Sequence, residues 1–398
     1  MTLVELLVGL VVTSLVLLAL SAGFIGVQQV YQREVHAKRT VESARLATAL
    51  LERSVVLAGF GLPPELAFEL APLAGLPCNA ADPRDNCTFQ PDGSNQLPQP
   101  VVTDDLAFRY RDPQYLRRAS ADAALTASGA INVAAGTLGV QVRPGQHFLL
   151  VCDSGAWGFV RATAPADATA SAFQFEAATA PYPTPSSAAC FQQTGPGAPM
   201  LLLVQERRVR IELFPPQPPE VRARPFLVMY RSLNRPTDCL TNLAACDLEP
   251  LAADVENFQV AWVMNRSPTV PPLDTDGTQV LGDDPAVAPE LPDPAAPHTQ
   301  PAYELAYGDP QRFNAHPTNV RGVRLSLTLR TQHPLPQRQL GLYPVQALGN
   351  WAPDAAEPDA FYRLTTTTSV RTPNLASRTF FQPVLTRAAG DLLNTWGG

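Results

Sequence analysis

The sequence predicts an α+β protein, in which one long amino-terminal helix packs on the antiparallel β-sheet of a large, loop-rich, β-dominated head. Three observations predict this class. Residues 6–27 carry no charge, no proline occurs before Pro63, and segments after Pro63 alternate apolar and polar residues with a period of two. The 398 residues are enough for such a helix followed by one large domain or two smaller ones.

Residues 1–58 are predicted to form a single helix that Gly59 and Pro63 end. Its first part, 1–28, is apolar on all sides and long enough to span a membrane, for which about 20 apolar residues suffice. Its second part, 29–58, is amphipathic, and one stripe is expected to pack on the sheet. That stripe consists of Ala37, Val41, Ala44, Thr48, Leu51 and Val55.

Residues 59–398 are predicted to form the head, as one domain or as two subdomains. Runs of alternating residues bounded by Gly, Pro, Asn and Asp predict its strands. They are 106–111, which Asp112-Pro113 should end; a hairpin of 146–152 and 158–162; 173–176; a hairpin of 201–213 and 226–231; 254–264; 320–331; and 363–371, a threonine-rich strand suited to a sheet edge.

Six cysteines fall into three pairs that are close in the sequence: Cys78 with Cys87, Cys152 with Cys190, and Cys239 with Cys246. Sequential pairing would close three small loops, although other connectivities are formally possible. An even number of cysteines behind an apolar helix favours disulfides and an oxidising compartment. A zinc site is disfavoured because the sequence contains no Cys-x-x-Cys.

The sequence offers little support for chemistry in the head. The net charge of −7 argues against nucleic-acid binding. Asp274 and Asp276 precede a glycine, with Asp283 following, and calcium loops use such carboxylates; the distal glutamate of an EF-hand is absent, so an acidic solvent loop is favoured. No Gly-x-Ser-x-Gly, phosphate loop or His-Glu-x-x-His occurs. We therefore expect no enzyme and no cofactor.

The first residues, Met1-Thr2-Leu3-Val4-Glu5-Leu6, place one carboxylate just ahead of the uncharged run. A carboxylate within a membrane is costly and normally has a partner. The arrangement resembles the amino terminus of mature type IV pilins and pseudopilins, although that family usually has Phe where Met1 stands. The resemblance implies a basic leader cut before residue 1 by a prepilin peptidase, N-methylation of Met1, and pairing of Glu5 with the amino terminus of an adjacent subunit. Met1 is then either a residue tolerated after cleavage or a start codon.

Beyond the helix, the sequence is similar to the PilW family of minor pilins. The similarity rests on residues 57–61, 254–260 and 320–327, and on the threonine-rich strand followed by Arg371 and Asn374. It implies a single-pass inner-membrane protein with a periplasmic head that later enters an extracellular type IV pilus. A few copies, at the tip, would start assembly and act in adhesion or carry a tip adhesin. Its partners would be other pilin and minor pilin subunits, the inner membrane and the prepilin peptidase, which is also the methylase.

Two other interpretations stay open at this point. A pseudopilin that caps the periplasmic pseudopilus of a type II secretion system would have the same helix. A signal-anchored periplasmic enzyme or binding protein would also begin with an apolar segment. The sequence disfavours this last interpretation, because a secretory signal begins with basic residues and has a shorter apolar core than residues 6–27.

Overall fold

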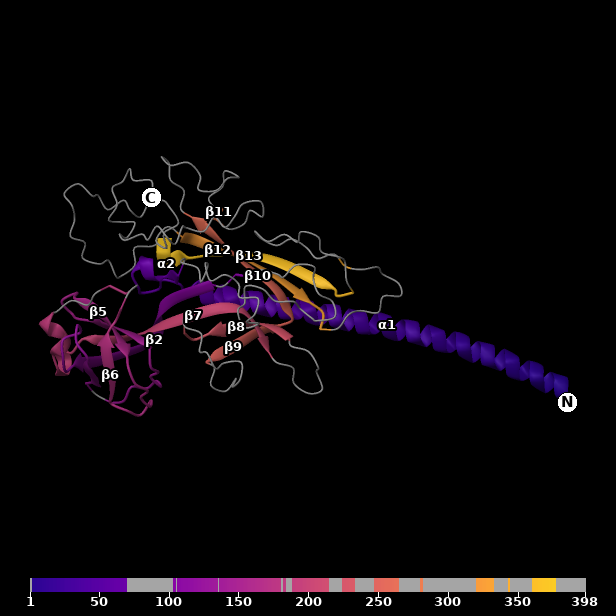
Figure 1. Cartoon of the computed structure of the whole chain (residues 1–398), viewed down its shortest axis with the longest axis horizontal. Coiled ribbons are helices and arrows are strands. Elements are labelled where there is room, and N and C mark those ends of the chain that lie inside the picture. Colours follow the sequence, from indigo (N-terminus) through magenta and orange to yellow (C-terminus); the bar gives the residue numbers. More distant parts are fainter. Residues whose placement is uncertain are drawn as a thin grey trace, which may run out of the picture.

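One long helix, α1 (Leu3–Val55), precedes a β-rich head of two antiparallel sheets, so the predicted α+β class is confirmed (Figure 1). The helix ends at residue 55 rather than at the predicted 58. The structure is a computed structural model. It describes residues 2–69, 103–104, 106–134, 136–179, 182–183, 188–214, 224–232, 247–264, 280–281, 320–332, 343 and 360–376.

Within these residues the first sheet has nine strands and the second has four. The order of the first is β1 (Phe68–Glu69), β2 (Leu106–Ala121), β3 (Gly129–Val133), β6 (Ala172–Ala177), β5 (Trp157–Ala162), β4 (His147–Val151), β7 (Met200–Phe214), β8 (Arg224–Tyr230) and β9 (Leu248–Ala253). The order of the second is β11 (Val280–Leu281), β10 (Val255–Met264), β12 (Val320–Arg330) and β13 (Arg363–Arg371). A short helix, α2 (Pro373–Ala376), follows β13.

Six strands of the first sheet close into a barrel. From β2 the pairing runs through β3, β6, β5 and β4 to β7, which pairs with β2 again. All six strands contribute side chains to its interior, including Tyr115, Phe148 and Phe173. Figure 1 shows β5 and β6 at the end of the head farthest from the amino terminus. The barrel is therefore the part of the described head that lies most distant from the start of α1.

Strand β2 does not end at Asp112-Pro113, so that prediction was wrong. The strand continues to residue 121, and its register with β7 shifts at this point. The Asp112 carboxylate accepts hydrogen bonds from the Gln114 backbone N–H and the Gln205 side chain, both at 2.8 Å. The Asp-Pro pair thus forms a β-bulge, which interrupts the ladder without ending the strand.

The other predicted strands are present, within a few residues of their expected bounds. β4 and β5 form the first predicted hairpin, and β7 and β8 form the second. In the described part of the second sheet, β13 is an edge strand, as its threonine content predicted. Hydroxyl pairs join it to β12, with Ser326 3.0 Å from Thr367 and Thr328 3.1 Å from Thr365.

A buried ion pair ties β13 to β10 in this sheet. Arg363 donates from Nε and Nη2 to the two carboxylate oxygens of Glu256, at 2.6 and 3.0 Å. Each side chain is only 2% exposed. Because two charges removed from water need each other's hydrogen bonds, this pair fixes the edge strand against the centre of the sheet.

The chain passes from the first sheet to the second through a single residue. β9 ends at Ala253 and β10 begins at Val255, so Asp254 alone joins them. Asp254 has a φ of 59°, in the left-handed region that residues other than glycine rarely adopt. Arg224 holds its carboxylate through Nε and Nη2, at 3.1 and 2.7 Å. This contact stabilises the crossing between the sheets.

The carboxyl-terminal half of α1 lies between the two sheets. It contacts β9 at the edge of the first sheet and β12 and β13 of the second. Ala44, Ala47, Leu51 and Val55 are buried in one cluster with side chains of β7, β8, β10 and β12. Of the predicted stripe, Ala37, Val41 and Thr48 are only half-buried, whereas Thr40 and Ala47, which the stripe did not include, are buried. The helix therefore completes the main core.

Leu51→Ala is expected to lower the free energy of unfolding by about 3 kcal/mol, because it leaves a cavity in this core. Leu51 has no exposed surface, whereas Leu46 on the same helix is 58% exposed. Leu46→Ala is the matched control and should change stability by less than about 0.5 kcal/mol. Urea unfolding of the full chain in detergent measures both variants, and equal losses would contradict the packing of α1 between the sheets.

The end of α1 is clamped by the segment that follows β13. Asn374 Nδ2 donates to the carbonyl oxygens of Val56 and Ala58, at 2.8 and 3.3 Å. Gly59 has a φ of 74°, and a Cβ there would lie 2.7 Å from Leu375 Cδ2. The glycine is thus required both for the left-handed turn and for the close approach of Leu375.

Candidate functional site: the exposed apolar helix

The amino-terminal half of α1 projects away from the head (Figure 1). Residues 15–18 are four successive apolar residues, each between 52% and 70% exposed. Because four residues complete a helical turn, the helix is exposed on every side. Its exposed large apolar side chains are Leu3, Val4, Leu7, Val8, Leu10, Val11, Val12, Leu15, Val16, Leu17, Leu18, Leu20, Phe24, Ile25, Val27, Val30 and Tyr31.

This helix is long and apolar enough to serve as a membrane anchor. The uncharged run 6–27 would extend about 33 Å as a helix, and the hydrocarbon core of a bilayer is about 30 Å thick. Contiguous apolar surface of this size on a soluble protein marks a site of interaction with a membrane or with other proteins.

Two of the three hydroxyl side chains inside the run bond to their own helix. Thr13 Oγ1 donates to the Gly9 carbonyl and Ser14 Oγ donates to the Val11 carbonyl, both at 2.8 Å. Hydroxyls bonded to their own helix need no external partner in an apolar environment. The run therefore presents apolar surface to which Thr13 and Ser14 add no unsatisfied hydroxyl.

The structure places Glu5 in the first turn of α1, where the helix dipole favours a negative charge. It does not describe the Glu5 side chain, and Met1 lies outside the described residues. The pairing of Glu5 and the processing of Met1 therefore stay predictions.

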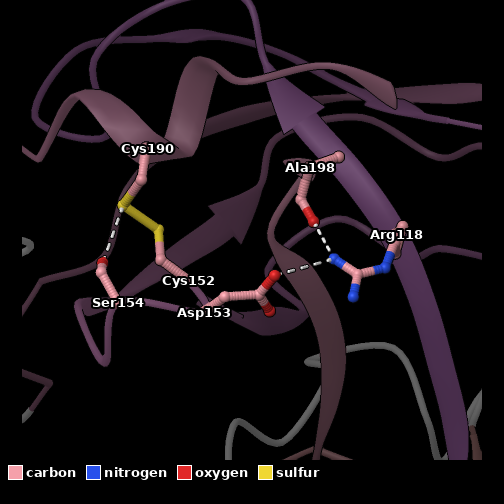
Figure 2. Close-up of a disulfide and its surroundings, with 6 residues drawn as sticks. All are labelled: Arg118, Cys152, Asp153, Ser154, Cys190 and Ala198. Carbon is pink, nitrogen blue, oxygen red and sulfur yellow. Dashed lines mark hydrogen bonds and ion pairs between the residues drawn. A yellow bond between two sulfur atoms is a disulfide. The ribbon is translucent and has the colours of Figure 1, made fainter. Parts of the chain in front are cut away.

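One of the three predicted cysteine pairs can be compared with the structure. Cys152 and Cys190 form a disulfide (Figure 2). The other cysteines and the calcium candidates lie outside the described residues; these are Cys78, Cys87, Cys239, Cys246, Asp274, Asp276 and Asp283. Within the described part of the chain, no group of three His, Cys, Asp or Glu side chains is placed to hold a metal ion.

This disulfide joins the end of β4 to a short 3-10 helix, Ala189–Gln192, in the connection between β6 and β7. Figure 2 shows a second attachment beside it. Arg118 of β2 donates to the Ala198 carbonyl at 2.6 Å and lies 3.7 Å from the Asp153 carboxylate. The two attachments fasten the connection to the barrel at two points, Cys190 and Ala198.

A buried charge cluster lies where the barrel meets the segment that leaves α1. Tyr182 donates its hydroxyl to Glu206 Oε1 at 2.6 Å, and His147 Nδ1 lies 3.2 Å from the same oxygen. Arg109 Nε is 3.6 Å from it, and Arg109 Nη2 donates to Glu69 at 2.6 Å. The His147 and Tyr182 rings stack, with their centroids 4.1 Å apart.

Electrostatics in this cluster favour an ionised Glu206. Burial acts to raise the pKa of Glu206, but the hydrogen bond and charge of His147, with Arg109 and Tyr182, outweigh it, so the pKa is lowered. Burial, followed by the charge of Glu206, holds the pKa of Tyr182 well above its ordinary value. The tyrosine therefore stays protonated, and its hydroxyl donates a hydrogen bond to the Glu206 carboxylate.

Sequence reasoning missed this cluster. Its members come from β1, β2, β4, β7 and the connection between β6 and β7, and no spacing along the chain brings them together. The one available signal was Arg109, a charged residue between apolar neighbours in a predicted strand.

Comparisons with known proteins add little to this description. No protein-family model matches the sequence, and no curated protein matches it. Among solved structures, the chain is similar to a type IV-like pilin from Thermus thermophilus, at 14% identity and a TM-score of 0.18. The match covers 58% of this chain and 85% of that chain. A TM-score this low carries no argument about fold or function.

Proposed function

We propose that the protein is a subunit of a type IV pilin-like filament, held in the bacterial inner membrane by α1 before assembly. The observation that carries this proposal is an apolar half-helix that is exposed on every side and continuous with a half that is built into the head. Lipid would cover this surface first, and the helices of neighbouring subunits would cover it in the filament. The head would be periplasmic and then extracellular.

Glu5 is proposed to set the register between subunits. It is the one charged side chain between residues 2 and 27, and Thr13 and Ser14 satisfy their own hydroxyls. An ionised carboxylate in an apolar environment is unfavourable until it meets an opposite charge. The amino terminus of the adjacent subunit, N-methylated after cleavage by a prepilin peptidase, is the partner that we propose.

Within this class we propose a minor, PilW-like pilin that is present in few copies. The head of about 340 residues is large for a subunit that must repeat along a thin fibre. A position at the tip would place the barrel, the part of the head distant from the anchor, where it can start assembly or take part in adhesion. The proposal gives the head no catalytic activity and no cofactor.

Mass spectrometry of sheared surface filaments from the native host tests this proposal. We expect an N-methylated peptide that begins at Met1, at low copy number relative to a main pilin. The same peptide found only in a periplasmic pseudopilus would move the protein to type II secretion. An unmethylated chain found only in membranes would contradict the filament proposal.

Glu5→Gln is expected to reduce incorporation into filaments at least tenfold, with the level in membranes unchanged, because the variant loses the charge that a neighbour must neutralise. The matched control is Glu42→Gln on the same helix. Glu42 is 64% exposed and only 3.8 Å from Lys38 in a surface ion pair, so incorporation should not change. Quantitative immunoblots of sheared filaments and membranes measure both, and equal incorporation of the two variants would refute the role of Glu5.

A further inference from the structure

The Glu206 cluster connects separate parts of the head. Glu206 and Arg109 are paired residues on β7 and β2. His147 belongs to the barrel strand β4, and Tyr182 belongs to the connection that the disulfide fastens. Arg109 also donates to the Leu66 carbonyl at 3.2 Å, in the segment that leaves α1. The cluster therefore links the outside of the barrel to that segment.

The hydrophobic contacts across the same junction form a cluster of their own. Leu62 and Leu66 pack on the outer side of the barrel in a small cluster that includes Leu149, Phe159 and Tyr182. This cluster is separate from the barrel interior and from the main core around α1. Ala67 and Phe68, which follow Leu66, are instead buried in the main core. Residues 62–66 are therefore the part of this segment that can loosen while both of the larger cores keep their packing.

Glu206 is the shared acceptor at this junction. The groups that face it are Arg109 from β2, His147 from β4 and Tyr182 from the connection, while Glu69 of β1 acts on it only through Arg109. A protonated Glu206 would lose the attraction of Arg109 and would accept only weakly from Tyr182. Its neutral carboxyl would also leave Arg109 with a single anionic partner.

We propose that Glu206 is an acid-sensitive latch between the barrel and residues 62–66: when its carboxylate takes up a proton, this junction opens while α1 and the second sheet stay folded. The pKa of Glu206 is lowered in the folded state, so its contribution to stability is present above the ordinary carboxyl pKa and is lost as the pH falls through the lowered value. The latch is therefore closed at neutral pH. This inference does not depend on the proposed filament function.

Hydrogen exchange of the full chain in detergent, read by mass spectrometry from pH 7 to pH 3, tests the latch. Rates are corrected for the intrinsic pH dependence of exchange. Peptides that cover 62–66 should lose protection at least tenfold at a pH about one unit above the pH at which peptides from 147–162 and 320–330 lose theirs, because the ladders of β4 and β5 lie within the barrel. Simultaneous loss in all of these peptides would overturn the proposal, because it would indicate ordinary acid unfolding.

Glu206→Gln provides the second arm at constant pH. At pH 7 this variant should already show the tenfold loss in 62–66, unchanged protection in 147–162 and 320–330, and no further local step on acidification. Glu212→Gln is the matched control, since Glu212 is also a buried glutamate of β7. It should leave 62–66 protected. A Glu206→Gln chain that behaves like the wild type would overturn the proposal, and if this variant fails to fold, the wild-type pH series still decides.

Discussion

Glu256→Ala is expected to lower the free energy of unfolding by about 3–5 kcal/mol, because it leaves the guanidinium of Arg363 buried without its carboxylate. Both side chains are only 2% exposed, and two hydrogen bonds join them. Since Arg363 lies on the edge strand β13, the loss should also free that strand from the sheet. Chemical denaturation of the full chain in detergent measures the effect.

Two controls distinguish the effect of burying this ion pair on stability from the effect of its charges alone. Glu42→Ala removes an exposed ion pair with Lys38 and should cost less than about 1 kcal/mol. The double variant Glu256→Met with Arg363→Leu should recover most of the lost stability, because apolar residues of similar volume can replace a buried pair. A loss below about 1 kcal/mol for Glu256→Ala would show that the pair is not buried as described.

Replacing Cys152 and Cys190 together by serine is expected to cost about 4 kcal/mol, the chain-entropy value for a closed loop of this length. The two cysteines are 38 residues apart in the sequence. The loss should be largest in the barrel, because the loop contains β5, β6 and the connection to β7. Reduction of the wild type with a thiol should reproduce it.

Ser154→Ala is the matched control for the disulfide. Its hydroxyl lies 3.9 Å from the Cys190 sulfur and is exposed, so stability should change by less than about 0.5 kcal/mol (Figure 2). Denaturation midpoints of the three chains, with and without thiol, make the comparison. A double serine variant with the wild-type midpoint would show that the cross-link does not stabilise the barrel.

The helix and most strands could be predicted from the sequence because their signals are local. The uncharged run 6–27 and the absence of proline before Pro63 were enough for α1, and alternation was enough for β12 and β13. The anchor surface follows from composition alone. In contrast, Asp112-Pro113 was read as the end of a strand, because a bulge and a strand end have the same turn residues.

What could not be predicted depends on contacts between distant segments. Closure of the barrel requires β2 and β7 to pair, and nothing in either strand specifies its partner. Asp254 carries no signal for a left-handed backbone until Arg224 is placed beside it. The residues around Glu206 likewise come together only in the completed fold.

The clamp on α1 has a consequence for the order of events during synthesis. Asn374 meets the Val56 carbonyl across 318 residues of chain. At roughly 5–20 residues per second, the ribosome needs about 15–60 s to make the intervening chain. During that interval the apolar helix can enter the membrane while the residues that lock its end to the head do not yet exist. The insertion that we propose would therefore precede closure, and the head would close around a helix that is already anchored.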